Sequence, residues 1–222
     1  MVVLIIAISR KASALKHALH LQTAERVMIR AAGPHDSDMI QCYVRNLVRD
    51  SRRNRFLGAL NELSAAELHG MTHGNHDSYP ALIAETVVAG IRVMIGEARY
   101  ALVSDGFGCE FALSVAEDWR HKRLGTLLVE IVASQANALG VRYLVGDVLR
   151  SNNAMIALAR KTGFSVVEPM ANPGLVRITK DLSRLYATAS RSESPHEWCV
   201  FQSASANRIV STGQSPASIA AS

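Results

Sequence analysis

The chain has 222 residues and a formal net charge of +5, which favours anionic partners without choosing among a phosphorylated cofactor, an acidic protein surface and nucleic acid. Hydrophobic residues make up 49% of it, enough for the core of a globular domain and more than a disordered chain contains. Aromatic residues make up only 5%, which argues against a surface that stacks the bases of single-stranded nucleic acid.

The cysteines and the apolar runs bear on the cellular location of the protein. The 3 cysteines are far apart and form no CxxC pair, so the sequence predicts neither a disulfide scaffold nor a structural zinc site. The apolar run at 2–8 is short, no cationic side chain precedes it and no A-x-A-like cleavage site follows it, in contrast to a signal peptide. No stretch approaches the roughly 18–20 apolar residues of a membrane span. We therefore expect a cytoplasmic protein.

Hydrophobic periodicity and turn residues predict strands and helices that interleave along the chain. In order, these are a strand at 27–30, a helix from about 37 to 48, strands at 81–88, 91–103 and 110–115, a helix at 124–139, a strand at 141–148, a helix at 153–162, and strands that begin at 163 and span 175–179. This order predicts an α/β (α+β) fold with a mixed central sheet flanked by helices.

Local signals mark several element ends. Ser64 and Glu67 have the spacing of a capping box, which predicts a helix start. Gly96 favours a bend or bulge within its strand, and Gly140 suits the C-terminal end of the long helix. The polar segment 71–80 is predicted to be a loop.

Three segments of different character follow one another along the chain. We expect residues 1–25 to be an N-terminal extension, either a short strand and helix or a poorly ordered leader. Residues 26–182 carry the regular pattern and are expected to form one domain. Residues 183–222 are rich in Ser and Ala without sustained periodicity, so we expect a disordered tail.

The segment 115–128 carries the clearest functional signal, because it runs from a strand through a short basic loop into a long helix. Such a junction directs backbone N–H groups and the positive end of the helix at one spot, which favours an anion. The residues that suit a pyrophosphate there are Arg120, Lys122, Arg123, Gly125 and Thr126. A solvated, basic helix start is the alternative for the same pattern.

The run from Arg120 to Gly125 resembles the acyl-CoA pyrophosphate loop of the GNAT N-acetyltransferases, written R/Q-x-x-G-x-G/A. Arg120 fills its first position and Gly125 its last, whereas Arg123 replaces the middle glycine. A side chain there either crowds the loop or supplies a further contact to phosphate.

A second segment, 152–164, resembles the N-x-x-A/M-x-x-L-x-x-x-x-G-F helix of the same family. This match implies that Asn152 hydrogen-bonds the pantetheine arm of the cofactor. Ala159 stands where the family often has a tyrosine that is proposed to protonate the leaving thiolate, so water or another group would have to serve. The two motifs occur in the family's order with a strand between them.

Within the family, the chain is similar to the acetyltransferase domain of bacterial protein lysine acetyltransferases, which is often fused to an ADP-forming acyl-CoA synthetase. The matching residues are 99–100, 109–112 and 146–149, with further matches at 29–30, 51–56 and 63–64. The resemblance covers roughly 27–182. It implies a GNAT fold, acetyl-CoA as the acyl donor and a protein lysine or a small-molecule amine as the acceptor, with no metal, nucleic acid or membrane partner.

The resemblance implies that Glu110 is the catalytic residue, a general base that removes a proton from the acceptor amine. Its neighbours Phe111 and Ala112 are expected to raise its pKa by desolvation. Backbone N–H groups near 113–115 are expected to polarise the thioester carbonyl, and the implied opening between the two central strands leaves them available. The expected cofactor-binding residues are Leu113, Val115, Arg120, His121, Lys122, Arg123, Leu124, Gly125, Thr126, Asn152 and Met155.

Other functions compete with this one. Arg123 and Ala159 depart from the family pattern, so a catalytically inactive acetyl-CoA sensor is the main alternative. The string GNHD at 74–77 occurs in metallophosphoesterases, but no G-D-x-x-D precedes it, and we expect a polar loop. The helix at 127–139 has Glu130 as its only charged residue, which argues against DNA recognition.

An arginine cluster remains open to two interpretations. Arg52, Arg53 and Arg55 either form a docking surface for the acceptor or belong to a solvated helix face. Of the two, the sequence slightly favours the solvated face.

Overall fold

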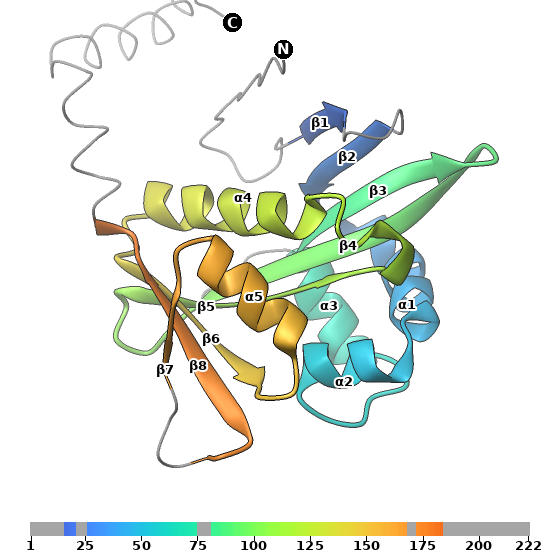
Figure 1. Ribbon diagram of the computed structural model, residues 1–222. Coiled ribbons are helices and arrows are strands. Elements are labelled where there is room, and N and C mark those ends of the chain that lie inside the picture. The colour runs from blue at the N-terminus through green and yellow to red at the C-terminus, as the bar shows by residue number, and fades with distance from the viewer. Residues whose placement is uncertain (1–15, 21–25, 75–80, 168–171, 184–222) are drawn as a thin grey trace, which may run out of the picture. The chain divides into compact units, whose positions relative to one another are not determined.

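The computed structural model describes residues 16–20, 26–74, 81–167 and 172–183, and every structural statement below refers to them (Figure 1). The predicted tail at 183–222 lies outside this part of the chain from residue 184 onward. The predicted extension at 1–25 is described only at 16–20, where it forms a strand.

Within the described residues, eight strands form one mixed sheet in the order β1-β2-β3-β4-β5-β6-β8-β7 (Figure 1). Neighbouring strands are antiparallel except for β5 and β6, which run parallel. The strands are β1 Lys16–His20, β2 Arg26–Ala31, β3 Leu82–Val88, β4 Ile91–Leu102, β5 Gly108–Val115, β6 Tyr143–Leu149, β7 Ser165–Val167 and β8 Leu175–Asp181. The predicted α/β fold with a mixed sheet is confirmed.

The helices cover the two faces of the sheet with two separate apolar cores. They are η1 Pro34–Asp36, α1 Ser37–Asn46, α2 Arg49–Phe56, α3 Ala65–His73, η2 Glu117–Trp119, α4 Leu124–Ala138 and α5 Asn153–Lys161. One core lies under α4 and α5, and the other lies under α1 and α3 (Figure 1). We call these the α4–α5 face and the α1–α3 face of the sheet.

The apolar pattern of the sequence explains why α4 lies where it does. Leu124, Leu128 and Val132 recur at four-residue spacing and are almost fully buried, so they form one stripe on the helix. Strand β5 alternates in the same way, since Cys109 and Phe111 are buried against the α4–α5 core. Glu110, which lies between these two residues, therefore points to the α1–α3 face.

Most of the local signals are confirmed, with one exception. Ser64 and Glu67 form the predicted capping box of α3, and Gly140, which follows the C-cap residue Leu139 of α4, has a φ of 81°. The β3–β4 register shifts opposite Gly96, as expected for a bulge. The loop predicted from residue 71 is wrong at its start, because α3 continues to His73 and buries Met71 in the core of the α1–α3 face.

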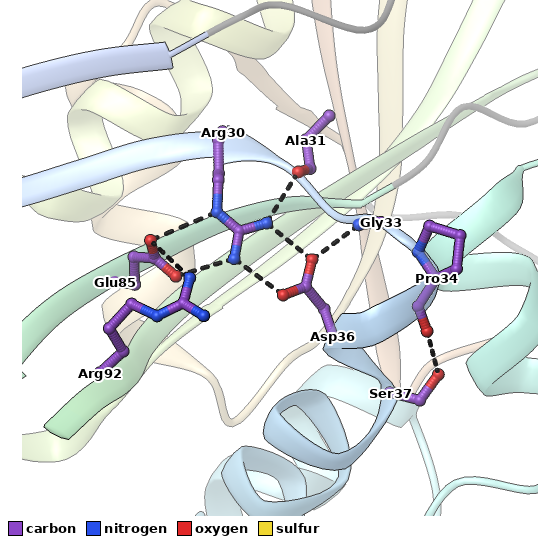
Figure 2. Close-up of polar contacts among 8 residues, drawn as sticks. All are labelled: Arg30, Ala31, Gly33, Pro34, Asp36, Ser37, Glu85 and Arg92. Atoms are coloured by element: carbon purple, nitrogen blue, oxygen red, sulfur yellow. Dashed lines mark hydrogen bonds and ion pairs between the residues drawn. The ribbon is translucent and has the colours of Figure 1, made fainter.

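A polar network joins β2 to the start of α1 (Figure 2). The Arg30 guanidinium donates to both carboxylate oxygens of Asp36, at 2.6 and 2.8 Å, and to both of Glu85, at 3.3 and 2.9 Å. Asp36 also accepts from the backbone N–H of Gly33 at 2.7 Å, and Arg92 lies 3.8 Å from Glu85. One arginine thus connects β2, β3 and the helical segment that follows β2.

Candidate functional site

The pairing of the two parallel strands stops early. Strands β5 and β6 pair at only three positions, from Gly108 opposite Tyr143 to Glu110 opposite Val145. On its other side, β5 stays paired with β4 as far as Val115. The edge of β5 from 111 to 115 therefore has no strand partner toward β6, as expected for the opening between the central strands.

Helix α4 begins with backbone donors that lack partners in the helix. No side chain caps its N-terminus, and the first intrahelical bond runs from the N–H of Leu127 to the carbonyl of Arg123, at 3.1 Å. The preceding N–H groups of Leu124, Gly125 and Thr126 belong to the unsatisfied first turn of a helix. A Cβ on Gly125 would lie 3.1 Å from the Leu158 side chain, so this glycine lets α4 approach α5.

The cationic side chains of the loop have different surroundings. Arg120 is held in place, because its guanidinium donates to the carbonyl of Val115 at 3.3 Å, to the Ser51 hydroxyl at 2.6 Å and to Glu117 at 3.0 Å. The Lys122 ammonium lies 4.4 Å from the centre of the Trp119 ring. His121 and Arg123 are exposed. The loop therefore combines fixed and solvent-facing cations at the start of α4.

The second predicted motif forms the start of α5. Asn152 is its N-cap, and the side-chain oxygen accepts from the N–H of Met155 at 3.1 Å. Met155 is partly buried against the α4–α5 core. Ala159 is fully buried in that core, so a larger side chain there would replace core packing.

Glu110 lies on the α1–α3 face and lines a groove of about 380 Å³. The groove covers a part of the sheet that α1, α2 and α3 do not line, and its walls are Val103, Ser104, Asp105, Glu110, Tyr143, Val145, Gly146, Asp147, Arg177 and Thr179. The expected desolvation of Glu110 is wrong. The residue is exposed, because strand alternation directs Phe111 to the opposite face.

The groove contains residues that were not predicted to act there. Asp105, Tyr143, Asp147 and Arg177 come from the β4–β5 turn, β6 and β8. The Asp147–Arg177 pair was detectable only in part, since each residue alternates with apolar ones on its own strand. Their proximity depends on the pairing of β6 with β8, which local periodicity does not encode.

A buried polar network lies on the same α1–α3 face of the sheet. Arg55 donates to Glu97 at 2.5 and 3.0 Å, the Ser114 hydroxyl donates to Glu97 at 2.7 Å, and the Tyr43 and Ser114 hydroxyls lie 3.0 Å apart. Glu97 is 1% exposed. The network ties α1 and α2 to β4 and to β5, and β5 is one of the two strands that border the opening.

The arginine cluster has mainly structural roles. Arg52 donates to the carbonyls of Arg45 and Leu47 at the end of α1 and to that of Leu60, and Arg55 is buried in the network above. Neither of these two residues belongs to a solvated helix face. Only Arg53 of the cluster is exposed.

Several other chemical candidates are limited by their surroundings. Cys109 is buried, which raises the pKa of its thiol to about 11 and keeps it protonated at neutral pH. Among the described residues, no group of three or more His, Cys, Asp or Glu side chains could hold a metal ion. The described helices include none with the length and hydropathy of a membrane span. Of the GNHD string, only Gly74 lies within the described residues.

Comparison with known proteins shows the family to which the chain belongs. A model of the acetyltransferase (GNAT) family matches residues 42–164, more than half of the chain. Acetyltransferase PA5475 of Pseudomonas aeruginosa is 26% identical over 144 residues, which are 65% of this chain and 77% of that protein.

Two solved structures share the fold. The GNAT domain of PAT from S. lividans superposes with a TM-score of 0.65 at 21% identity and covers 75% of this chain and 96% of its own. Spermidine N-acetyltransferase from Vibrio cholerae, solved in complex with CoA and spermine, gives a TM-score of 0.56 at 16% identity and covers 72% of this chain and 98% of its own. At these identities, the likeness concerns the fold.

Proposed function

Since the chain belongs to the GNAT acetyltransferase family and is thereby an acyl-CoA-dependent N-acetyltransferase, we propose that it transfers the acetyl group of acetyl-CoA to a protein lysine side chain, with Glu110 as the general base. The observation that carries this proposal is the position of Glu110. Its carboxylate lies at the last paired rung of β5 and β6 and lines the groove on the α1–α3 face. The predicted cytoplasmic location rests on the sequence alone.

The start of α4 supports the placement of the cofactor's pyrophosphate. The N–H groups of Leu124, Gly125 and Thr126 carry the partial positive charge of an uncapped helix N-terminus. The exposed side chains of His121 and Arg123 can move toward a bound anion, while Arg120 and Lys122 add charge from fixed positions. These residues therefore fit a pyrophosphate.

The free edge of β5 supports the placement of the thiol arm. An extended strand rises roughly 16 Å between residues 110 and 115, so the loop and Glu110 are separated by a distance that needs an extended arm such as pantetheine. The unpaired edge from Leu113 to Val115 offers backbone groups along this path. At the start of α5, Asn152 uses its side-chain oxygen as a cap, which leaves the side-chain amide nitrogen as the group proposed to contact the arm.

The acceptor is proposed to enter from the groove. A lysine ammonium must lose a proton before it attacks a thioester, and an exposed carboxylate next to the opening can accept that proton directly or through one water molecule. Attack of the neutral amine on the thioester carbonyl forms the amide and releases the thiolate of CoA, which takes up a proton from solvent. Backbone N–H groups on the unpaired edge of β5 are the candidates for stabilising the oxyanion.

The proposal is tested by calorimetric titration with acetyl-CoA and by thiol-release assays with lysine-containing acceptor proteins. We expect Glu110→Gln to bind acetyl-CoA within about 2-fold of the wild type and to lose about 10²–10⁴-fold in kcat/KM, the usual contribution of a general base. Glu130→Gln is the matched control, because Glu130 is an exposed glutamate on α4, away from the groove.

The possible outcomes separate the competing functions. Binding without turnover on any acceptor would favour the acetyl-CoA sensor. Absence of binding would overturn the proposed cofactor site. Equal turnover by Glu110→Gln and the wild type would remove Glu110 as the base and leave the transferase in place.

A further inference from the structure

The groove beside Glu110 contains three carboxylates and one guanidinium on adjacent parts of the sheet. Glu110 lies opposite Val145 on β6, and Asp147 follows two residues later on the same strand and face. Asp147 in turn lies opposite Arg177 on β8. Asp105 is in the β4–β5 turn at the other end of the groove.

Asp147 is already paired within the protein. The Arg177 guanidinium donates to its two oxygens at 2.8 Å each, in the bidentate geometry that is strongest for this pair. The hydrogen bonds from Arg177 lower the pKa of Asp147, and those to Asp147 raise the pKa of Arg177, so both remain charged at neutral pH. Side-chain exposures of 54% for Arg177 and 26% for Asp147 leave the pair accessible from the groove.

Asp105 is also engaged. Its carboxylate accepts from the Tyr143 hydroxyl and from the backbone N–H groups of Phe107 and Gly108, at 2.7 and 3.1 Å. These bonds, above all the one from Tyr143, hold the pKa of Asp105 below its usual range. Asp105 thereby closes the turn, and three of its roughly four lone-pair positions are in use.

Glu110 differs from both. Among the described residues, its carboxylate has no hydrogen-bond or ion-pair partner, and it interacts with the charge of Arg177 beyond ion-pair distance. A reacting ammonium that pairs with Glu110 would therefore find no second free carboxylate toward β8. A second ammonium of the same acceptor would meet an ion pair whose more exposed member is the Arg177 guanidinium, so it would gain no free carboxylate and would lie beside a like charge, which is unfavourable.

Resting on the proposed transferase activity, we propose that the Asp147–Arg177 ion pair is a specificity element of the acceptor groove. It selects acceptors whose reacting amine is the only cationic group that enters the groove, such as a lysine side chain within a protein, and it rejects diamines and polyamines. Glu110 and Asp147 are separated by one strand and two residues, a diagonal of roughly 8 Å. That spacing would suit a short diamine if Asp147 were free.

The test compares two acceptors of similar length that differ in charge, Nα-acetyl-lysine amide with one ammonium and cadaverine with two. We expect wild-type kcat/KM to be at least about 10-fold higher for the monoamine. Arg177→Gln frees the Asp147 carboxylate and should reduce this ratio about 10-fold or more. The double variant Asp147→Asn/Arg177→Gln removes both charges. It should therefore not show the increase in kcat/KM for cadaverine that is expected of Arg177→Gln alone.

Two controls establish that the ratio reports on the groove. Arg45→Gln removes one arginine from an exposed ion pair far from it, and should leave the ratio unchanged. Each variant is also titrated with acetyl-CoA, and its affinity should match that of the wild type, since neither residue is placed at the cofactor loop. Thermal unfolding confirms that each variant is folded.

The results distinguish this inference from the proposed function. Wild-type preference for cadaverine, or an unchanged ratio in Arg177→Gln, would overturn the specificity element while the acetyltransferase stands. Failure of the wild type to acetylate any amine despite binding acetyl-CoA would overturn the proposed function, and this inference with it.

Discussion

Arg123 adopts a backbone conformation that few side chains tolerate. Its φ of 68° and ψ of 0° lie in the left-handed region, at the position where the R/Q-x-x-G-x-G/A motif has glycine. For a residue with a Cβ this conformation costs roughly 1–2 kcal/mol. The side chain is also exposed and cationic at the positive end of a helix. Its charge is therefore repelled by the helix dipole in the protein without a ligand, and it would attract a bound anion.

Substitution of Arg123 separates strain from charge. We expect Arg123→Gly to raise the free energy of unfolding by about 0.5–1 kcal/mol, because the relief of strain exceeds the added entropy of the unfolded chain. Arg123→Ala keeps the strained conformation and should gain less. Urea denaturation measures both, and a glycine variant no more stable than the alanine variant would contradict this interpretation.

At the scale of elements, α2 depends on ionic contacts more than on apolar packing. Within its span Arg49–Phe56, Arg55 is buried against Glu97, and Ser51 contacts both Glu117 and Arg120 at the basic loop before α4. A buried ion pair contributes little net stability when it is compared with an apolar pair. The loss of one partner is costly, however, because it leaves the other charge buried and unpaired.

We therefore expect Glu97→Gln to lower the free energy of unfolding by about 3–5 kcal/mol. Glu62→Gln is the matched control, since the Arg45–Glu62 pair is 59% exposed on both sides and should contribute less than about 1 kcal/mol. The double variant Arg55→Met/Glu97→Gln should be more stable than the sum of its single changes implies. Equal losses for Glu97→Gln and Glu62→Gln in chemical denaturation would show that the buried network does not hold α2.

At the scale of the whole molecule, lowered carboxyl pKa values make the fold sensitive to acid. The hydrogen bonds from Arg30, drawn in Figure 2, lower the pKa of Asp36. The hydrogen bonds from Ser64 lower the pKa of Glu67. A group whose pKa is lower in the folded state stabilises the fold fully above its unfolded pKa. That contribution disappears as the pH falls through the folded value.

The expected result is a loss of stability as the pH falls below about 4, the unfolded pKa of aspartate. Asp36→Asn should be less stable than the wild type at pH 7, and its stability curve should converge with that of the wild type in acid. Asp38→Asn, an exposed change two residues further on in the first turn of α1, controls for the loss of one charge. Thermal unfolding from pH 7 to pH 3 measures the curves, and a constant gap between wild type and Asp36→Asn would contradict the assignment.

The sequence alone determined the features that depend on short-range rules. Alternation with period two identified β5, and four-residue spacing identified α4. The capping box at Ser64 and the glycine after α4 were readable because their partners lie within a few residues. The loop 120–125 and the start of α5 were located in the same way, by spacing along the chain.

Only the tertiary structure decided the features that join distant parts of the chain. The early end of the β5–β6 ladder, the exposure of Glu110 and the meeting of Asp147 with Arg177 all depend on which strands pair and in which register. The same holds for Arg55. The sequence of its own helix favours a surface arginine, whereas in the structure the side chain is buried against Glu97. Local periodicity states which residues share a face, whereas the packing of the whole chain selects what each face contacts.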